Sequence, residues 1–119
     1  MADEIVCSAK LEMLKNGVHA ELQKFGLRID MTGTEHLEHV QTIGITEEAL
    51  SLGDVATPGM FLAINLDPTN FVKIRSATGV TDLAKLLPGE FCLFRMAATA
   101  PFAIADTAAC RLWYLLLEA

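Results

Sequence analysis

The sequence Glu-His-Leu-Glu-His, at residues 35–39, comes nearest to the residue types of a metal site. Imidazole nitrogens and carboxylate oxygens are common zinc ligands. On a helix His36 and His39 would be neighbours, but residues three apart point to opposite faces of a strand. Hydrophobic and polar residues alternate here, which predicts a strand over about 36–43. The remaining histidine, His19, falls in a separate predicted hairpin, so we expect no bound metal.

Nucleophilic and acid–base groups are not arranged for catalysis either. No serine lies in a Gly-x-Ser-x-Gly elbow, and Cys92 falls in an apolar segment, where a thiol is usually inert packing. Carboxylates gather at 35–38 and 47–48, on segments expected at the surface, while Asp82 and Asp106 lie near predicted loops as turn formers. The glycines are isolated and form no phosphate-binding loop. We therefore expect no catalytic residue and no cofactor, and interpret the protein as not an enzyme.

The charge balance argues against nucleic acid and anionic membranes as partners. Nine Lys and Arg face fifteen Asp and Glu, for a formal net charge of −6. Affinity for phosphates needs clustered basic residues, and here they are scattered. The apolar runs are shorter than the roughly 20 residues of a membrane-spanning helix. The opening Met-Ala-Asp-Glu has no basic region typical of a secretory signal.

Composition points to one domain that associates with other subunits. The chain has 119 residues, of which 52% are hydrophobic and 20% charged, against about 25% charged in an ordinary domain. A domain this small buries only about two thirds of its unfolded surface, so we expect part of the apolar surplus to face other subunits. Cys7, Cys92 and Cys110 are an odd number at wide spacings, which favours reduced thiols over disulfides or a zinc site.

The elements that position these residues are predicted to be strands. In the first half, apolar residues alternate with polar ones over 5–13, 18–23 and 27–32. The pair Asn16-Gly17 separates the first two runs and predicts a two-residue hairpin turn with both residues at positive φ. A further strand is expected over about 46–52, where a short helix capped by Thr46 is the alternative. In the second half, short strands are expected at 60–66, 71–75, 83–87, 91–96, 102–105 and 108–117.

Turn residues punctuate the second half at two places. Asp67-Pro68-Thr69-Asn70 fits a type I turn, and Pro88-Gly89 fits a type II turn with glycine at the positive-φ position. Residues 83–87 could instead form one helical turn, and 112–117 could be helical by propensity, although the surrounding pattern favours a strand. Nine to eleven short strands with turns every 8–12 residues predict an all-β antiparallel sandwich or barrel, as one domain over 1–119.

Two of the predicted strands, 60–66 and 108–117, are apolar on both faces. A strand of a sandwich that stands alone should have one wet face. These strands could be central ones beneath a loop. Apolar patches rarely stay exposed on monomers, so we favour a contact with a neighbouring subunit. The candidate interface residues are Trp113, Tyr114, Leu115, Phe61 and Leu62.

Three segments of the second half resemble small structural proteins of tailed bacteriophages. They read GDVATPGMFLAINLDPTNFVKI at 53–74, KLLPGEFCLFRMA at 85–97 and AIADTAACRLWYLLLE at 103–118. The order of these segments carries the resemblance. The matching positions are turn formers and core residues, so the resemblance supplies no functional residue; they are Asn65, Asp67, Asn70, Pro88, Gly89 and Asp106.

The resemblance implies a virion component without enzymatic activity. In such families the expected role is a capsid cement or decoration protein: a jelly-roll-like β-sandwich that forms a homotrimer and binds the major capsid protein. It would be made in the cytoplasm of the host bacterium and end on the capsid surface. A tail, neck or fibre-base protein is the first alternative. A cupin-like β-barrel that binds a small molecule or acts as an enzyme is the second.

Overall fold

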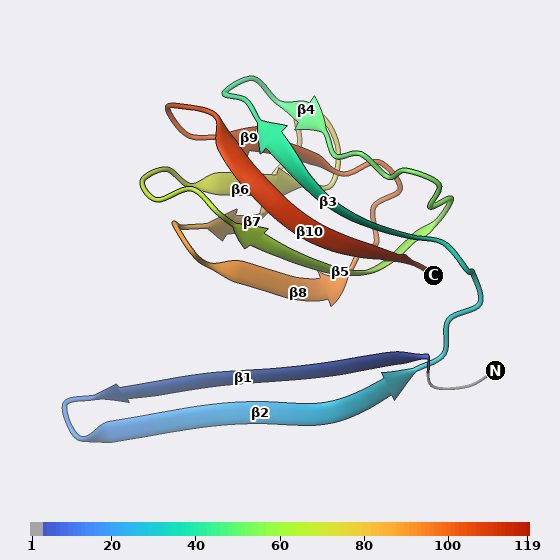
Figure 1. Ribbon diagram of the computed structural model, residues 1–119. Coiled ribbons are helices and arrows are strands. Elements are labelled where there is room, and N and C mark those ends of the chain that lie inside the picture. The colour runs from blue at the N-terminus through green and yellow to red at the C-terminus, as the bar shows by residue number, and fades with distance from the viewer. Residues whose placement is uncertain (1–3) are drawn as a thin grey trace. The chain divides into compact units, whose positions relative to one another are not determined.

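The prediction of an all-β fold is confirmed. A computed structural model describes residues 4–119, and these form ten strands and no helix (Figure 1). No helix long and apolar enough to cross a membrane therefore occurs in this part of the chain. The strands are β1 (Ile5–Lys15), β2 (Val18–Ile29), β3 (His36–Ile43), β4 (Glu48–Ala49), β5 (Pro58–Asn65), β6 (Val72–Arg75), β7 (Asp82–Leu86), β8 (Phe91–Arg95), β9 (Phe102–Ala105) and β10 (Cys110–Glu118).

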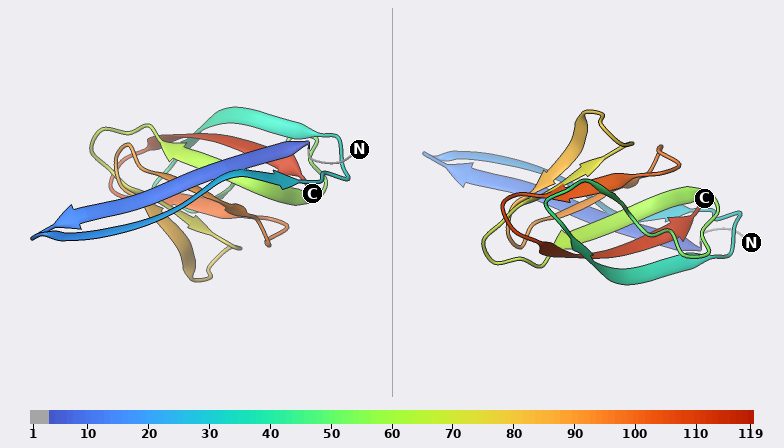
Figure 2. Two further views of the ribbon diagram at one scale, coloured as in Figure 1. Left: turned by 90° about the horizontal axis from the view of Figure 1, so that it is seen from below. Right: turned by 90° about the horizontal axis from the view of Figure 1, so that it is seen from above.

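The chain divides into two compact units, which meet between Thr32 and Gly33. In the first unit, β1 and β2 form an antiparallel sheet of their own and run side by side along their length (Figure 2). The second unit, Gly33–Ala119, holds the other eight strands. The sandwich is thus confined to the second unit, whereas the sequence led us to expect one sandwich domain over 1–119. Alternation shows that a strand has an apolar face, but not which element covers that face.

The second unit is an antiparallel sandwich of two four-stranded sheets, which lie one behind the other in Figure 1. One sheet has the order β3-β10-β5-β8 and the other the order β4-β9-β6-β7. The first and last strands of the unit, β3 and β10, are neighbours, and most successive strands alternate between the sheets. This is the strand order of a jelly roll, in agreement with the predicted fold.

The core lies between the two sheets, where alternate residues of β5 and β10 point inward. Phe61 and Tyr114 are the largest of these, with ring centroids 5.6 Å apart, and Phe94 packs on Phe61 at the same distance. The Tyr114 hydroxyl donates a hydrogen bond to the Ser51 carbonyl at 2.7 Å, so its polar end is satisfied. Burial raises the pKa of this tyrosine to about 12.

The Asn-Leu-Asp-x-Thr-Asn motif builds the turn after β5. The buried Asn65 amide nitrogen donates to the carbonyls of Asn70 (2.9 Å) and Leu86 (3.0 Å), and its oxygen accepts from the Asp67 amide. The Asp67 carboxylate accepts from the amides of Asn70 and Thr69, which lowers its pKa. The hydrogen bonds of these polar residues stabilise the turn, so their role is structural.

The two glycine turns have the geometry that their sequences require. Asn16 and Gly17 have φ values of 52° and 75°, so both lie in the left-handed region that an Asn-Gly hairpin turn needs. Gly89 has a φ of 79°, and the Glu90 amide donates to the Leu87 carbonyl at 2.9 Å. That bond closes the type II turn around Pro88-Gly89.

Candidate assembly interface

The outer face of the sheet β3-β10-β5-β8 is apolar over its two central strands, β10 and β5, and this apolar area extends to Val40 on β3 and to Phe91 and Leu93 on β8. Its residues follow from the register, which aligns them in rows across the sheet. One row holds Phe91, Ile64, Trp113 and Val40, and the next holds Leu93, Leu62, Leu115 and Glu38. Beyond these rows Arg95 pairs with Met60 and Leu117 pairs with His36, where the register between β5 and β10 shifts. We call this surface the outer sheet face. It can bind by apolar contact, and its charged side chains Glu38 and Arg95 lie on the edge strands β3 and β8.

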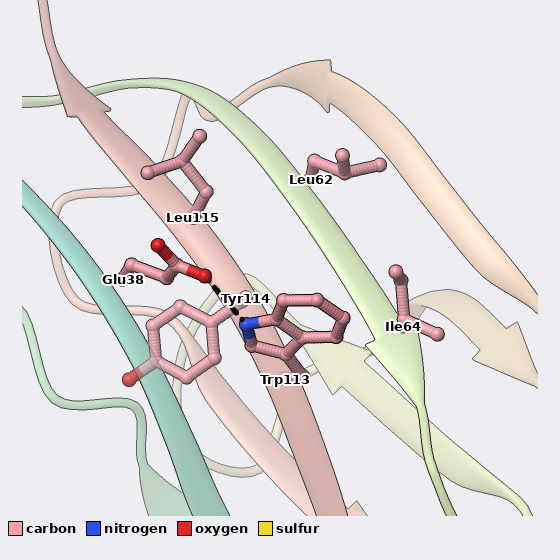
Figure 3. A pocket seen from close by; sticks show the side chains of 6 residues that line it. All are labelled: Glu38, Leu62, Ile64, Trp113, Tyr114 and Leu115. Atoms are coloured by element: carbon pink, nitrogen blue, oxygen red, sulfur yellow. Dashed lines mark hydrogen bonds between the residues drawn. The ribbon is translucent and has the colours of Figure 1, made fainter.

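A shallow hollow of about 170 Å³ lies at the centre of the outer sheet face (Figure 3). Trp113, Leu115, Leu62 and Ile64 supply its apolar lining. The Trp113 indole N–H donates to the Glu38 carboxylate at 3.0 Å, which fixes the ring while 40% of the residue stays exposed. A fixed, part-exposed tryptophan beside an apolar hollow is the arrangement of an interface anchor.

Three of the five predicted interface residues lie on this face, and two do not. Trp113, Leu115 and Leu62 point outward, as a surface contact requires. The prediction is wrong for Phe61 and Tyr114, each 1% exposed, because they occupy the alternate positions that face the core. Since both faces of these strands are apolar, the sequence does not reveal which one points inward.

The first unit presents a second apolar surface, on strands that we expected to form part of a single sandwich domain over 1–119. On one side of the β1–β2 hairpin, Leu11 and Leu22 lie opposite each other and are 78% and 79% exposed. Met13, Val18 and Leu27 are on the same side and are also exposed. We call the hairpin, Ile5–Ile29, the arm, and this side the apolar arm face. Exposed apolar side chains in such number indicate a surface made for contact.

A β-bulge keeps the apolar arm face continuous. The register shifts between Cys7 and Ala9, where Phe25 and Gly26 together lie opposite Ser8. Gly26 has a φ of 68°, and its amide donates to the Ser8 hydroxyl at 3.0 Å. The extra residue lets the apolar positions of β2 change from even numbers before the bulge to odd numbers after it. The change from even-numbered to odd-numbered apolar positions around Gly26 is therefore the feature of the sequence that indicates the bulge.

The histidines of residues 35–39 do not converge. His36 pairs with Leu117 on the outer sheet face, whereas His39 pairs with Tyr114 and so lies on the opposite side of β3. The His39 ring meets the Tyr114 ring edge-on, with centroids 6.0 Å apart.

The arm brings together a group that the sequence analysis did not identify. Glu12, His19 and Glu21 lie on the side away from the apolar arm face, with potential ligand atoms within 4.8 Å of one another. The His19 imidazole and the Glu12 carboxylate are hydrogen bonded at 2.8 Å. The three side chains are exposed. The Asn-Gly turn fixes the register that places Glu12 opposite Glu21. The position of this turn in the sequence could therefore have revealed the group.

The perturbed ionisable groups of the second unit have structural roles. Arg75 joins the carboxylates of Glu47 (2.7 Å) and Asp82 (2.6 Å). Hydrogen bonds from Thr78, Arg75 and the Gly79 amide lower the pKa of Glu47 to about 2. Burial raises the pKa of the Cys92 thiol to about 11, which keeps it protonated and unreactive at neutral pH.

Comparisons of the chain with protein-family models, curated proteins and solved structures find no match. The resemblance to phage structural proteins therefore rests on the order of the motifs in residues 53–118.

Proposed function

We propose that this chain is a non-enzymatic virion structural protein of a tailed bacteriophage, which binds the major capsid protein on the outside of the capsid and stabilises its lattice. The observation that carries the proposal is the pair of apolar surfaces, the outer sheet face and the apolar arm face, on so small a protein. The jelly-roll sandwich and the motif order in 53–118 support the same role, since jelly rolls are frequent in viral shells.

The packing between the sheets favours this role over a cupin-like one, although cupins share the jelly-roll architecture. A cupin-like site needs polar groups that converge on a ligand between the sheets. Among residues 4–119, the buried set has two side chains with an amide or hydroxyl group: Asn65, whose amide is bonded to backbone groups, and Tyr114, whose hydroxyl donates to the Ser51 carbonyl. The space where such a ligand would bind is filled by aromatic and aliphatic side chains.

Stabilisation would come from multiple weak contacts. A trimer that touches several capsid subunits makes its second and third contacts within one complex, at a high effective concentration. A protein that binds the assembled shell and not its separated subunits shifts the equilibrium toward the shell. No chemical step is needed, and the net charge of −6 gives long-range attraction a minor part.

The test is reconstitution on shells of the phage that encodes the chain. Shells assembled without the protein should open at a lower temperature than complete shells, and added purified protein should restore the higher temperature. A Leu62→Lys variant, altered on the outer sheet face, should restore less than a Lys73→Gln variant altered on the other sheet. Failure to bind expanded shells, together with antibody labelling of the tail, would overturn the capsid role in favour of a tail or neck component.

A further inference from the structure

We propose that the Glu118 carboxylate is an acid-sensitive latch, which holds two segments of the sandwich together while it is ionised and loosens them when it is protonated. The first segment, residues 33–35, leads into β3. The second is the loop of residues 50–57 before β5. All of these residues belong to the second unit, so the inference depends neither on where the arm lies nor on the proposed function.

The carboxylate joins the two segments because each of its oxygens serves a different one. Oε1 accepts hydrogen bonds from the amides of Thr34 (2.9 Å) and Glu35 (3.2 Å). Oε2 accepts a hydrogen bond from the Ala56 amide at 3.0 Å. Glu118 can reach both segments because, at the end of β10, its backbone pairs with Glu35 on one side and lies opposite Pro58 on the other.

Gly33 leaves the space that the latch occupies. A Cβ at this position would lie 2.2 Å from Oε1 of Glu118 and 2.4 Å from its Cγ, far closer than van der Waals contact. A free glutamate side chain could move aside, but this one accepts three backbone hydrogen bonds and would lose them. The close approach of the side chain therefore requires a glycine here. This requirement is independent support for a carboxylate that is held in one place.

The protonation state of the carboxyl group controls the latch. Hydrogen bonds from the amides of Ala56, Glu35 and Thr34 lower the pKa of Glu118, against the opposing effect of burial. Protonation turns one of the two oxygens into a hydroxyl, which is a donor and a poorer acceptor, so it loosens the segment that this oxygen serves. Because the pKa is lowered in the folded protein, the latch is closed above the usual pKa of a glutamate and opens as the pH falls through the lowered value.

Other titratable and charged groups lie on the elements around Glu118, and the test must distinguish them from it. They belong to the segment before β3, to β3 itself, to the loop, to the end of β8 and to the chain end: Glu35, His36, Asp54, Arg95 and the carboxyl group of Ala119. The amides of both segments donate to the Glu118 oxygens. Their signals should therefore follow the titration of Glu118 and of no other group.

Opening of the latch affects the connection between the two units, because residues 33–35 directly follow the first unit in the chain. Two backbone hydrogen bonds also align this segment with the end of β10, from the Gly33 amide to the Ala119 carbonyl and from the Glu118 amide to the Glu35 carbonyl. Pairing at the end of a strand opens more easily than pairing in the core, so the carboxylate sets how firmly the segment is held. Its release would lengthen the connection by about 10 Å of extended chain.

The test is an NMR titration of the full chain from neutral to acidic pH. It follows the amide protons of Thr34, Glu35 and Ala56 together with the side-chain carboxyl carbon of Glu118. All four signals should change with one midpoint, which lies below the usual pKa of a glutamate. The amide signal of Phe61 in the core should stay unchanged over this transition, because the latch opens locally.

Two variants open the latch at neutral pH by different routes. Glu118→Gln keeps the size of the side chain but places an NH₂ donor where one segment needs an acceptor. Gly33→Ala puts a methyl group into the space of the carboxylate. Both variants should exchange the amide hydrogens of Thr34 and Ala56 several-fold faster than wild type. In neither should these amide signals keep the acid transition of the wild-type protein.

The matched controls alter the same residue types without touching the latch. Glu35→Gln removes a carboxylate from the same segment and keeps the backbone amide that Glu118 accepts. Gly44→Ala adds a Cβ that would make an ordinary contact, 3.6 Å from Oε1 of Glu48. In both controls the amides of Thr34 and Ala56 should exchange as in wild type.

The proposal is wrong if the amide signals follow the carboxyl carbon of Glu35 or Asp54 instead of that of Glu118. It is also wrong if the core amides become exposed at the same pH as the amides of the two segments, because Glu118 would then be an ordinary part of one cooperative fold. Unchanged exchange in both Glu118→Gln and Gly33→Ala would show that the backbone pairing holds the segments without the carboxylate.

Discussion

Individual residues with an unusual backbone conformation or charge environment stabilise each unit separately. Gly17 has a φ of 75° and open space within 4 Å of where a Cβ would lie, so a side chain there meets backbone strain and no clash. We expect Gly17→Val to destabilise the arm by roughly 1–2 kcal/mol, because a β-branched residue is strained at positive φ. Amide hydrogen exchange of β1 and β2 measures this directly, since the arm is a separate unit.

The control for that change is Gly17→Asn, because asparagine tolerates positive φ better than valine. Exchange in the arm should be close to wild type for the asparagine variant and faster for the valine variant. Equal exchange rates for the two variants would show that strain at this turn does not limit the arm.

Glu47 gives a prediction about pH. Its pKa is lowered from 4.5 to about 2 in the folded protein, so its ionised form stabilises the fold above pH 4.5 and this stabilisation is lost as the pH falls toward 2. Glu47→Gln should therefore unfold at lower urea concentration than wild type at pH 7. The difference should shrink between pH 4.5 and 2, and a difference that does not depend on pH would contradict the assigned cause.

At the scale of elements, local chemistry explains what the sequence could predict. The turns at Asn16-Gly17 and Pro88-Gly89 were predictable because each depends on the φ preferences of its own residues. The strands of the sandwich were predictable from alternation. The separate arm was not, because the alternation in 5–13 is the same whether the sandwich or another chain covers the apolar side.

The two faces of β10 illustrate the same limit at the candidate interface. Leu112 and Leu115 are both leucines in an apolar run, yet the first is buried in the core and the second is part-exposed on the outer sheet face. The face that becomes part of the core is the one that the second sheet covers. That sheet is formed by residues distant in the sequence, so the local pattern of β10 does not identify the buried face. For this reason both residues were predicted at an interface, although only Trp113 is exposed and Tyr114 is buried.

This difference predicts opposite effects of two similar substitutions. Leu112→Ala should cost roughly 2–5 kcal/mol of folding stability, because it leaves a cavity in the core. Leu115→Ala should cost the isolated fold less and weaken association instead. Urea unfolding of dilute protein and native mass at higher concentration separate the two effects. If Leu115→Ala destabilises the dilute fold as much as Leu112→Ala, the assignment of the faces is wrong.

At the scale of the whole molecule, each of the two units has an apolar surface that its own strands leave exposed. We expect the purified protein to form a closed homotrimer of three 12.9 kDa chains, measurable by native mass spectrometry. The physical reason is the excess of exposed apolar surface, which association removes from water. A mass of one chain at micromolar concentration would contradict this expectation.

The proposed place of the protein on the capsid is tested most directly by counting its copies in purified virions, relative to the major capsid protein. A decoration protein that binds across the lattice should be present in hundreds of copies. Its removal from the virion should lower the temperature at which the shell opens. Tens of copies or fewer, retained in isolated tails, would contradict the capsid role and assign the chain to the tail or neck.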